Sequence, residues 1–78
     1  MNITWTYEII NKSREDDHLI TEIDLQFDGD IQDKVILSVY HFRPQTKNDV
    51  LAGIENRIIT EKDRLVGYKT IDKIISEL

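Results

Sequence analysis

KVILSVYHF, residues Lys34–Phe42, decides the fold of this chain, because six of its nine residues are aliphatic or aromatic. β-branched and aromatic residues favour strands, so we predict a strand here. Side chains of a strand alternate between its two faces, which places Val35 and Leu37 on one face and Ile36 and Tyr40 on the other. Both faces are therefore largely apolar. A small sheet needs only one such face for its core, so the other face must be covered by a further element or by a partner.

Two further strands are predicted before this one. Ile3–Ile10 alternates in polarity and should turn Trp5 and Tyr7 toward the core. Asn11–Asp17 is polar without periodicity, which predicts a loop. In His18–Phe27 the odd positions are mostly apolar and the even positions are largely acidic or amide, so we expect the odd face to be buried and the even face to be exposed.

The connection after the second strand carries a hairpin signal, Asp28-Gly29. A two-residue turn at this point would set Phe27 opposite Asp30 and bury polar groups against the apolar face. Strand register follows the buried face, so we predict a longer loop, Asp28–Asp33, with pairing that resumes near Lys34.

A helix follows the third strand. Proline cannot donate to a sheet ladder, so Pro44 ends the strand. Thr46 lies three residues before Asp49, a spacing typical of a capping box. Apolar residues then recur at helical spacing over Lys47–Val66, and we expect Gly67 to end the helix in the left-handed conformation.

Thr70 is expected to cap a short last helix that runs to Leu78. We expect this segment to fold back and cover Ile59 and Val66, although so short a helix is marginal without tertiary contacts. Two alternatives remain open: the segment extends the long helix, or it docks on a neighbouring chain.

The predicted fold class is α+β. It is a three-stranded antiparallel meander in the order β-β-β-α, packed by one long helix, with a short C-terminal helix, in a single domain over residues 1–78. The side chains that we expect to be buried are those of Trp5, Tyr7, Ile9, Ile23, Leu25, Phe27, Val35, Leu37, Val39, Val50, Ile54, Ile58 and Leu65.

Composition narrows the classes of function. Fifteen acidic and ten basic residues give a formal charge of −5, and no Lys/Arg cluster provides the basic footprint of a nucleic-acid binder. The chain has no cysteine, hence no disulfide and no thiolate metal site. There is no long apolar run, and the N-terminal MNITWTYEII does not resemble a signal peptide. We therefore expect a cytoplasmic protein that binds neither membrane nor nucleic acid directly.

Little in the sequence predicts catalysis. His18 and His41 are the only imidazoles, and no nucleophile or orienting motif accompanies either of them. The acidic residues Asp24, Asp28, Asp30 and Asp33 do not follow the spacing of a calcium loop, and the three glycines are isolated from one another. We expect no enzyme activity, no metal, no cofactor and no small-molecule substrate.

The residues most typical of a binding surface are Ile36, Tyr40, Phe42 and Arg43. If the even face of the third strand stays uncovered, it presents residue types enriched at interface hot spots. The alternative is that Asn11–Asp17 or the C-terminal segment covers this face, in which case the aromatic rings are core. A chain of 78 residues has few elements for a second layer, so the expected partner is another protein or a second copy.

An acidic surface allows a second function. An acidic domain can occupy the basic groove of a nucleic-acid enzyme as a mimic of the phosphate backbone, although a negative charge is more often only solubilising. The residues that would face such a groove are Glu15, Asp16, Asp17, Asp28, Asp30 and Asp33.

Three stretches, taken together, resemble small uncharacterised proteins of tailed bacteriophages. They are EIINKSR (8–14), ITEIDLQFDG (20–29) and HFRPQTKNDVLAGIENRIITEKDRL (41–65). The resemblance implies a minor virion component, an assembly factor or an inhibitor of a host protein, placed in the host cytoplasm or the virion. It assigns no functional residue and does not extend beyond Gly67. We therefore expect a non-enzymatic protein-binding or assembly module, with an acidic inhibitor of a host nucleic-acid-processing or defence enzyme as the alternative and an enzyme as a distant third.

Overall fold

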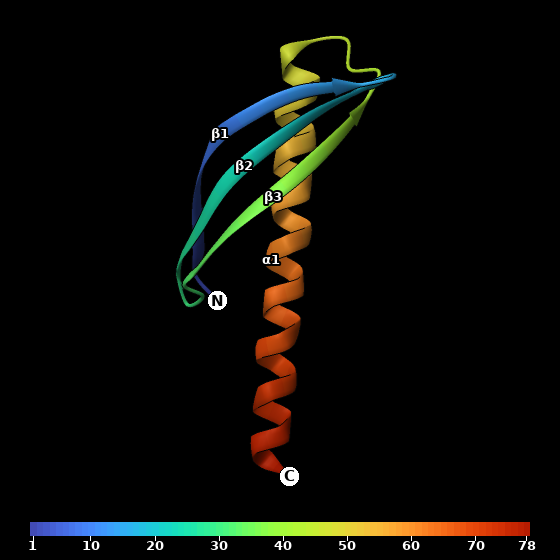
Figure 1. The fold of residues 1–78 in the computed structure, drawn as a ribbon. Coiled ribbons are helices and arrows are strands. Elements are labelled where there is room, and N and C mark those ends of the chain that lie inside the picture. The colour runs from blue at the N-terminus through green and yellow to red at the C-terminus, as the bar shows by residue number, and fades with distance from the viewer.

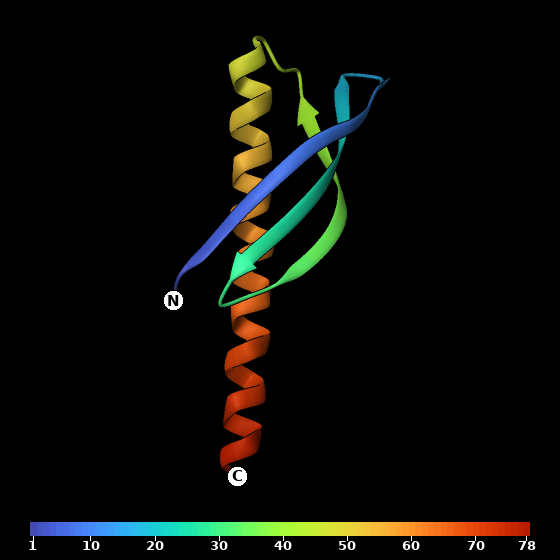
Figure 2. The same cartoon turned by 90° about the vertical axis from the view of Figure 1, so that its left-hand side faces the viewer.

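A computed structural model describes all residues, 1–78, as one sheet and one helix (Figure 1). Strands β1 (Ile3–Glu15), β2 (His18–Gly29) and β3 (Asp33–Phe42) pair antiparallel in the order β1-β2-β3. Helix α1 (Lys47–Glu77) crosses one face of the curved sheet and runs on beyond it (Figures 1 and 2). The α+β meander followed by a long helix is confirmed. We call the sheet face toward α1 the inner face and the opposite face the outer face.

The first hairpin differs from the predicted one. The expected loop Asn11–Asp17 is wrong, because β1 continues to Glu15 and only Asp16 and Asp17 form the turn, Asp16 with φ 51°. A bulge at Ile10 shifts the register, since Ile9 pairs with Ile23 but Asn11 pairs with Glu22. Strand pairing needs only backbone groups, so this polar segment joins the ladder at an exposed corner without burying its side chains.

The second connection is a longer loop and not a two-residue turn, as predicted, but it is shorter than Asp28–Asp33, because β2 runs to Gly29 and β3 begins at Asp33. Phe27 pairs with Asp33, so a loop of several residues separates regular β2–β3 pairing, and Lys34 pairs with Gln26. Gly29 has φ 98° and lies against the N-terminal backbone, where a Cβ would come 2.2 Å from the carbonyl oxygen of Asn2. Only glycine fits this position, because both the conformation and the space exclude a side chain.

The start of α1 is also as predicted. The backbone N–H of Asp49 donates to Thr46 Oγ1 at 3.2 Å, and the backbone N–H of Thr46 donates to Asp49 Oδ2 at 3.1 Å. These reciprocal bonds are a capping box, which satisfies two backbone donors that the first helical turn leaves without partners.

The expected end of the helix and the short second helix are wrong. The helix continues through Gly67 to Glu77, which is the extension left open as an alternative. Gly67 is not among the residues with positive φ, and Thr70 Oγ1 donates to the carbonyl of Val66 instead of capping a new helix. An interior glycine costs about 1 kcal/mol relative to alanine, which an already propagating helix tolerates. The segment does not fold back, and Ile59 remains 40% exposed.

The core lies between α1 and the inner face of the sheet. Seven of the thirteen side chains predicted to be buried are buried, and the other six are half-buried and pack against them, as do Ile3 and Ile31. The seven are Ile23, Leu25, Phe27, Leu37, Val39, Ile54 and Ile58. The six are Trp5, Tyr7, Ile9, Val35, Val50 and Leu65.

A histidine also belongs to the core. His41 is 6% exposed, and its Nε2 lies 3.0 Å from Oγ1 of the buried Thr21. Gly53 of α1 faces the other side of this ring, where a Cβ would lie 2.8 Å from His41 Nδ1. A glycine at this position therefore lets the helix approach β3 over the imidazole.

The two glycines of α1 should respond oppositely to alanine. Gly53→Ala should destabilise the fold by about 1–2 kcal/mol, because the overpacking cost against a fixed ring exceeds the gain in helix propensity. Gly67→Ala should stabilise it by about 1 kcal/mol, because a Cβ there meets nothing within 4 Å. Urea unfolding followed by circular dichroism measures both. Equal effects of the two changes would contradict the role given to Gly53.

Stability should fall as the pH falls through the titration of His41. Burial lowers the pKa of His41 below its usual value of 6.5, so the unfolded chain takes up a proton before the folded chain does. The contribution is complete above about pH 6.5 and is lost progressively as the pH drops toward the lowered pKa. The measurement is the unfolding free energy between pH 8 and pH 5, compared with His41→Gln, which removes the titration but keeps an amide near Thr21. Identical pH slopes for the two proteins would show that His41 does not drive the dependence.

Candidate functional site: the outer face and the free end of the helix

The two histidines lie on opposite faces of the sheet. His41 points inward to Thr21, while His18 lies on the outer face, where it pairs with Phe42. Neither contacts a carboxylate through a hydrogen bond or an ion pair. The structure therefore does not bring them together as a catalytic pair.

Of the four aspartates weighed as metal ligands, Asp28, Asp30 and Asp33 accept hydrogen bonds from other groups of the chain. Asp30 Oδ2 accepts from the backbone N–H of Asn2 at 2.6 Å, and Asp33 Oδ1 accepts from the backbone N–H of Lys34 at 2.9 Å. No group of three or more His, Cys, Asp or Glu side chains comes close enough to hold a metal ion. These side chains fix the β2–β3 loop and the N-terminal residues that run beside it.

Glu61 is the one buried acid; its spacing from Arg57 and Arg64 predicts pairing on the helix surface, but its burial was not predicted. It is 2% exposed, and it accepts hydrogen bonds from Arg64 and, at 3.4 Å, from Arg57. The hydrogen bond from Arg64 is the main reason that the pKa of Glu61 is lowered, against the opposing effect of burial. A carboxylate locked in its charged form between two guanidinium groups is a poor proton donor or acceptor, so this cluster is structural.

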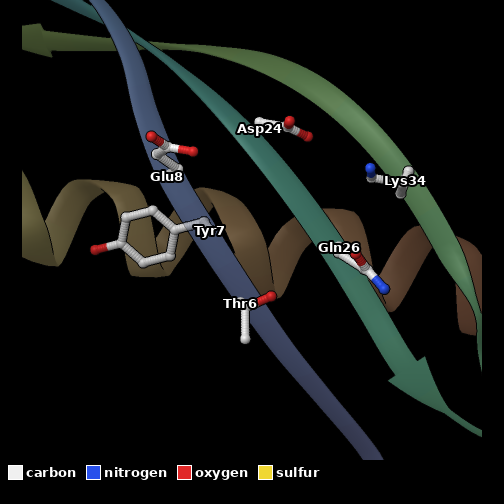
Figure 3. A pocket seen from close by; sticks show the side chains of 6 residues that line it. All are labelled: Thr6, Tyr7, Glu8, Asp24, Gln26 and Lys34. Atoms are coloured by element: carbon white, nitrogen blue, oxygen red, sulfur yellow. The ribbon is translucent and has the colours of Figure 1, made fainter.

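A shallow hollow of about 210 Å³ opens on the outer face (Figure 3). Thr6, Glu8, Asp24, Gln26 and Lys34 line it from all three strands, and Glu8 lies directly opposite Asp24 in the sheet. The hollow is open and its lining is almost entirely polar. It lacks the apolar, enclosing walls of a typical small-molecule site.

Large apolar side chains gather on the outer face along β3, from Ile36 to Phe42 at the C-terminal end of the strand. Ile36, Tyr40 and Phe42 are 62%, 64% and 63% exposed. On β2, Ile20 pairs with Tyr40 and His18 pairs with Phe42, which widens the apolar area across two strands. We call these five residues the outer patch.

Neighbouring side chains hold the aromatic rings of the outer patch in place. The ring centroid of His18 lies 6.3 Å from that of Tyr40 and 5.2 Å from that of Phe42. The Arg43 guanidinium lies 5.1 Å above the Phe42 ring, and it also pairs with Asp17 at 3.0 Å. The four residues predicted as a binding surface, Ile36, Tyr40, Phe42 and Arg43, therefore lie along one strand and its end, with their side chains supported but not covered.

The outer patch has no cover from this chain. Asn11–Glu15 forms part of β1 within the same sheet, and α1 passes behind the sheet when the outer face is viewed (Figure 2). The C-terminal turns lead away from the sheet instead of returning over it (Figures 1 and 2). Both elements that could have buried the rings are thus directed elsewhere.

The free end of α1 carries a second apolar surface. Lys69 Nζ donates to the carbonyl of Asp30 at 2.5 Å, and the turns after it extend beyond the sheet. At 100° per residue, Ile71, Ile74 and Leu78 point roughly 100–160° away from the core-facing Ile54, whereas Tyr68 and Ile75 point within roughly 60° of it, so this surface overlaps the direction of the core contact only in part. We call it the terminal stripe; it consists of Tyr68, Ile71, Ile74, Ile75 and Leu78, each at least half exposed.

The helix is nevertheless not a membrane span, since α1 contains no stretch long and apolar enough to cross a bilayer.

Comparison with known proteins adds no family: no protein-family model, no curated protein and no solved structure matches the chain. The functional argument therefore depends on the surfaces just described.

Proposed function

We propose that this chain is a non-enzymatic protein-binding or assembly module that binds its partner through the outer patch, with Ile36, Tyr40, Phe42 and Arg43 as the main contacts. One observation carries the proposal: three large apolar side chains on a single strand each remain more than 60% exposed on a face that no element covers. Tyrosine, phenylalanine and arginine are enriched at interfaces, and clustered exposed apolar side chains often mark an interaction site.

The apolar gain from this patch is useful but limited. Complete burial of one such side chain stabilises a complex by about 1.5–3 kcal/mol, so burying the remaining exposed two-thirds of three side chains gives about 3–6 kcal/mol. Micromolar binding corresponds to about 8 kcal/mol, and association has its own entropic cost. The partner must therefore also make polar or backbone contacts with this chain.

The terminal stripe supports an assembly role. It lies on the turns of α1 that extend beyond the sheet, so it can dock on a partner without disturbing the sheet. A small protein with two separate apolar surfaces, the outer patch and the terminal stripe, is suited to binding two subunits of an assembly at once.

A phage origin and a host cytoplasmic or virion location belong to this proposal. Their support is the resemblance of residues 8–14, 20–29 and 41–65 to small phage proteins, together with the absence of cysteine.

A second candidate, the acidic inhibitor, is favoured by the charge of the outer face. Glu8, Glu22 and Asp24 lie on the outer face beside the outer patch. The six acidic residues first considered divide between the two ends of β2: one group lies at the β1–β2 turn and the other at the β2–β3 loop. A row of carboxylates between two acidic ends could follow a basic nucleic-acid groove.

Removal of the rings should separate binding from folding. Tyr40→Ala combined with Phe42→Ala should leave the circular dichroism spectrum and cooperative unfolding intact, because these side chains lie outside the core. The same variant should lose the partner that the wild-type chain retains in a pull-down, and it should lose any self-association seen by sedimentation. The matched control is Ile10→Ala combined with Ile59→Ala, which removes two apolar side chains that are 46% and 40% exposed and belong to neither the outer patch nor the terminal stripe. Unfolding of the double aromatic variant would show that the rings are core and would remove the basis of the proposal.

Ionic strength distinguishes the two candidates. Binding of the retained partner through the outer patch should change little between low and physiological ionic strength, because apolar docking is insensitive to screening. Phosphate mimicry should weaken steeply over the same interval. Titration calorimetry with the identified partner measures this dependence, and a steep loss would favour the inhibitor.

A further inference from the structure

The two edge strands of the sheet differ in how well they are protected against pairing. β1 carries the bulge at Ile10 and a charged end that includes Lys12 and Arg14, both of which are common devices that discourage edge pairing. β3 pairs with β2 over ten consecutive residues without a register shift, contains no proline, and has charges only at Asp33 and Lys34. A long, regular, mostly apolar edge is a ready template for another strand.

This edge is free within the chain. The sheet order ends at β3, so its outward backbone groups have no strand partner. Gly53 of α1 approaches β3 on the inner face, beside the side chain of His41. The limited apolar gain of the outer patch calls for additional backbone contacts, and the edge that adjoins the patch can supply them.

We infer that the partner of this surface is a second copy of the chain, bound by antiparallel pairing of β3 with β3 about a two-fold axis at Ser38. The inference rests on the proposed function and names its partner. Directly opposite residues in an antiparallel pair face the same side, and this register sets Ile36 opposite Tyr40 of the second copy. It also brings Asp33 near Arg43 of the second copy, which directly follows β3 with φ 45°, so that opposite charges lie near each other at both ends.

Neighbouring registers fit less well. A two-fold axis at Leu37 would place Ile36 opposite Ser38 and Asp33 opposite the buried His41 of the second copy. A two-fold axis at Val39 would set Ile36 opposite Phe42, apolar with apolar, but would leave Asp33 opposite Gln45, beyond the end of β3. Only the axis at Ser38 matches apolar with apolar and acid with base.

Two features of the structure make this register accessible. The ion pair that now holds Arg43 to Asp17 joins two side chains that are 67% and 57% exposed, so it contributes little and can exchange. Lys34 would face Phe42 of the second copy, an arrangement compatible with cation–π contact. The two-fold axis stands perpendicular to the sheet, so both α1 helices stay on the inner face of a six-stranded sheet and the two outer patches become continuous.

The chain has no cysteine, so single cysteines report the register directly. In the proposed dimer of Ser38→Cys, position 38 of one copy lies opposite position 38 of the other. Their Cα atoms are about 4.5–5.5 Å apart, a distance that suits a disulfide. Mild oxidation should convert this variant to a species of twice 9.2 kDa on a non-reducing gel. Ser13→Cys, exposed on the outer face of β1, is the matched control and should stay monomeric.

A mixed pair tests the offset. Ile36→Cys and Tyr40→Cys should each cross-link poorly alone, because like positions in the two copies are four residues out of register. An equimolar mixture of the two variants should give the cross-linked heterodimer. Wild-type chain should sediment as a dimer at the same concentration.

Each other outcome overturns the inference. A monomer in sedimentation with no Ser38→Cys cross-link excludes the dimer, and a dimer that cross-links through Ile75→Cys instead assigns the contact to the terminal stripe. If the inference fails while Tyr40→Ala with Phe42→Ala still abolishes capture of a different protein, the proposed function stands without it. If the aromatic variant also retains every partner, both fail.

Discussion

The structure depends on the packing of a single helix against a single sheet. Ile54 and Ile58 of α1 pack with the inner-face residues Ile23 and Leu25 in one buried cluster. No element lies on the outer face of the sheet. One helix covers one face, so every apolar side chain on the other face remains exposed unless a partner arrives. The exposure of the outer patch is thus a direct consequence of the number of elements, not of a local distortion.

Much of this could be predicted from the sequence because strand periodicity records which face is buried. Alternation in His18–Phe27 identified the inner residues, and the conflict between Asp28-Gly29 and the buried face gave the longer β2–β3 loop. The capping box at Thr46 and Asp49 was visible because both partners lie within one helical turn. In each case the interaction that determines the structure is either local or repeated.

The errors occurred where tertiary context outweighs local preference. The polar Asn11–Glu15 segment has no apolar pattern, yet it extends β1 because β2 offers a backbone ladder beside it. Gly67 is a typical helix stop, but nothing forces the backbone there into the left-handed conformation, and α1 continues. The burial of His41 and Glu61 depends on where α1 lies against the sheet, whereas the partners of Glu61, Arg57 and Arg64, lie within about one turn of it on the same helix.

The same limit applies to the candidate site. The sequence could name Ile36, Tyr40 and Phe42 but could not decide whether they are core, since that depends on the direction of the last eleven residues. Continuation of α1 decides it: the turns that could have covered the outer patch instead carry their own apolar stripe away from the sheet.

The net negative charge of the chain explains how β3 can expose apolar side chains without causing aggregation. The formal charge of −5 makes copies repel at distances within the Debye length of about 8 Å at physiological salt. This repulsion opposes random contacts between outer patches, because the carboxylates of Glu22 and Asp24 lie on the same face. When Asp33 of one copy lies near Arg43 of the other at both ends, the local electrostatic interaction between the copies becomes attractive, and the backbone ladder can form. Repulsion elsewhere on the surface thus favours one specific mode of association over unspecific aggregation. Under this condition an exposed strand edge can serve as a binding site without causing aggregation.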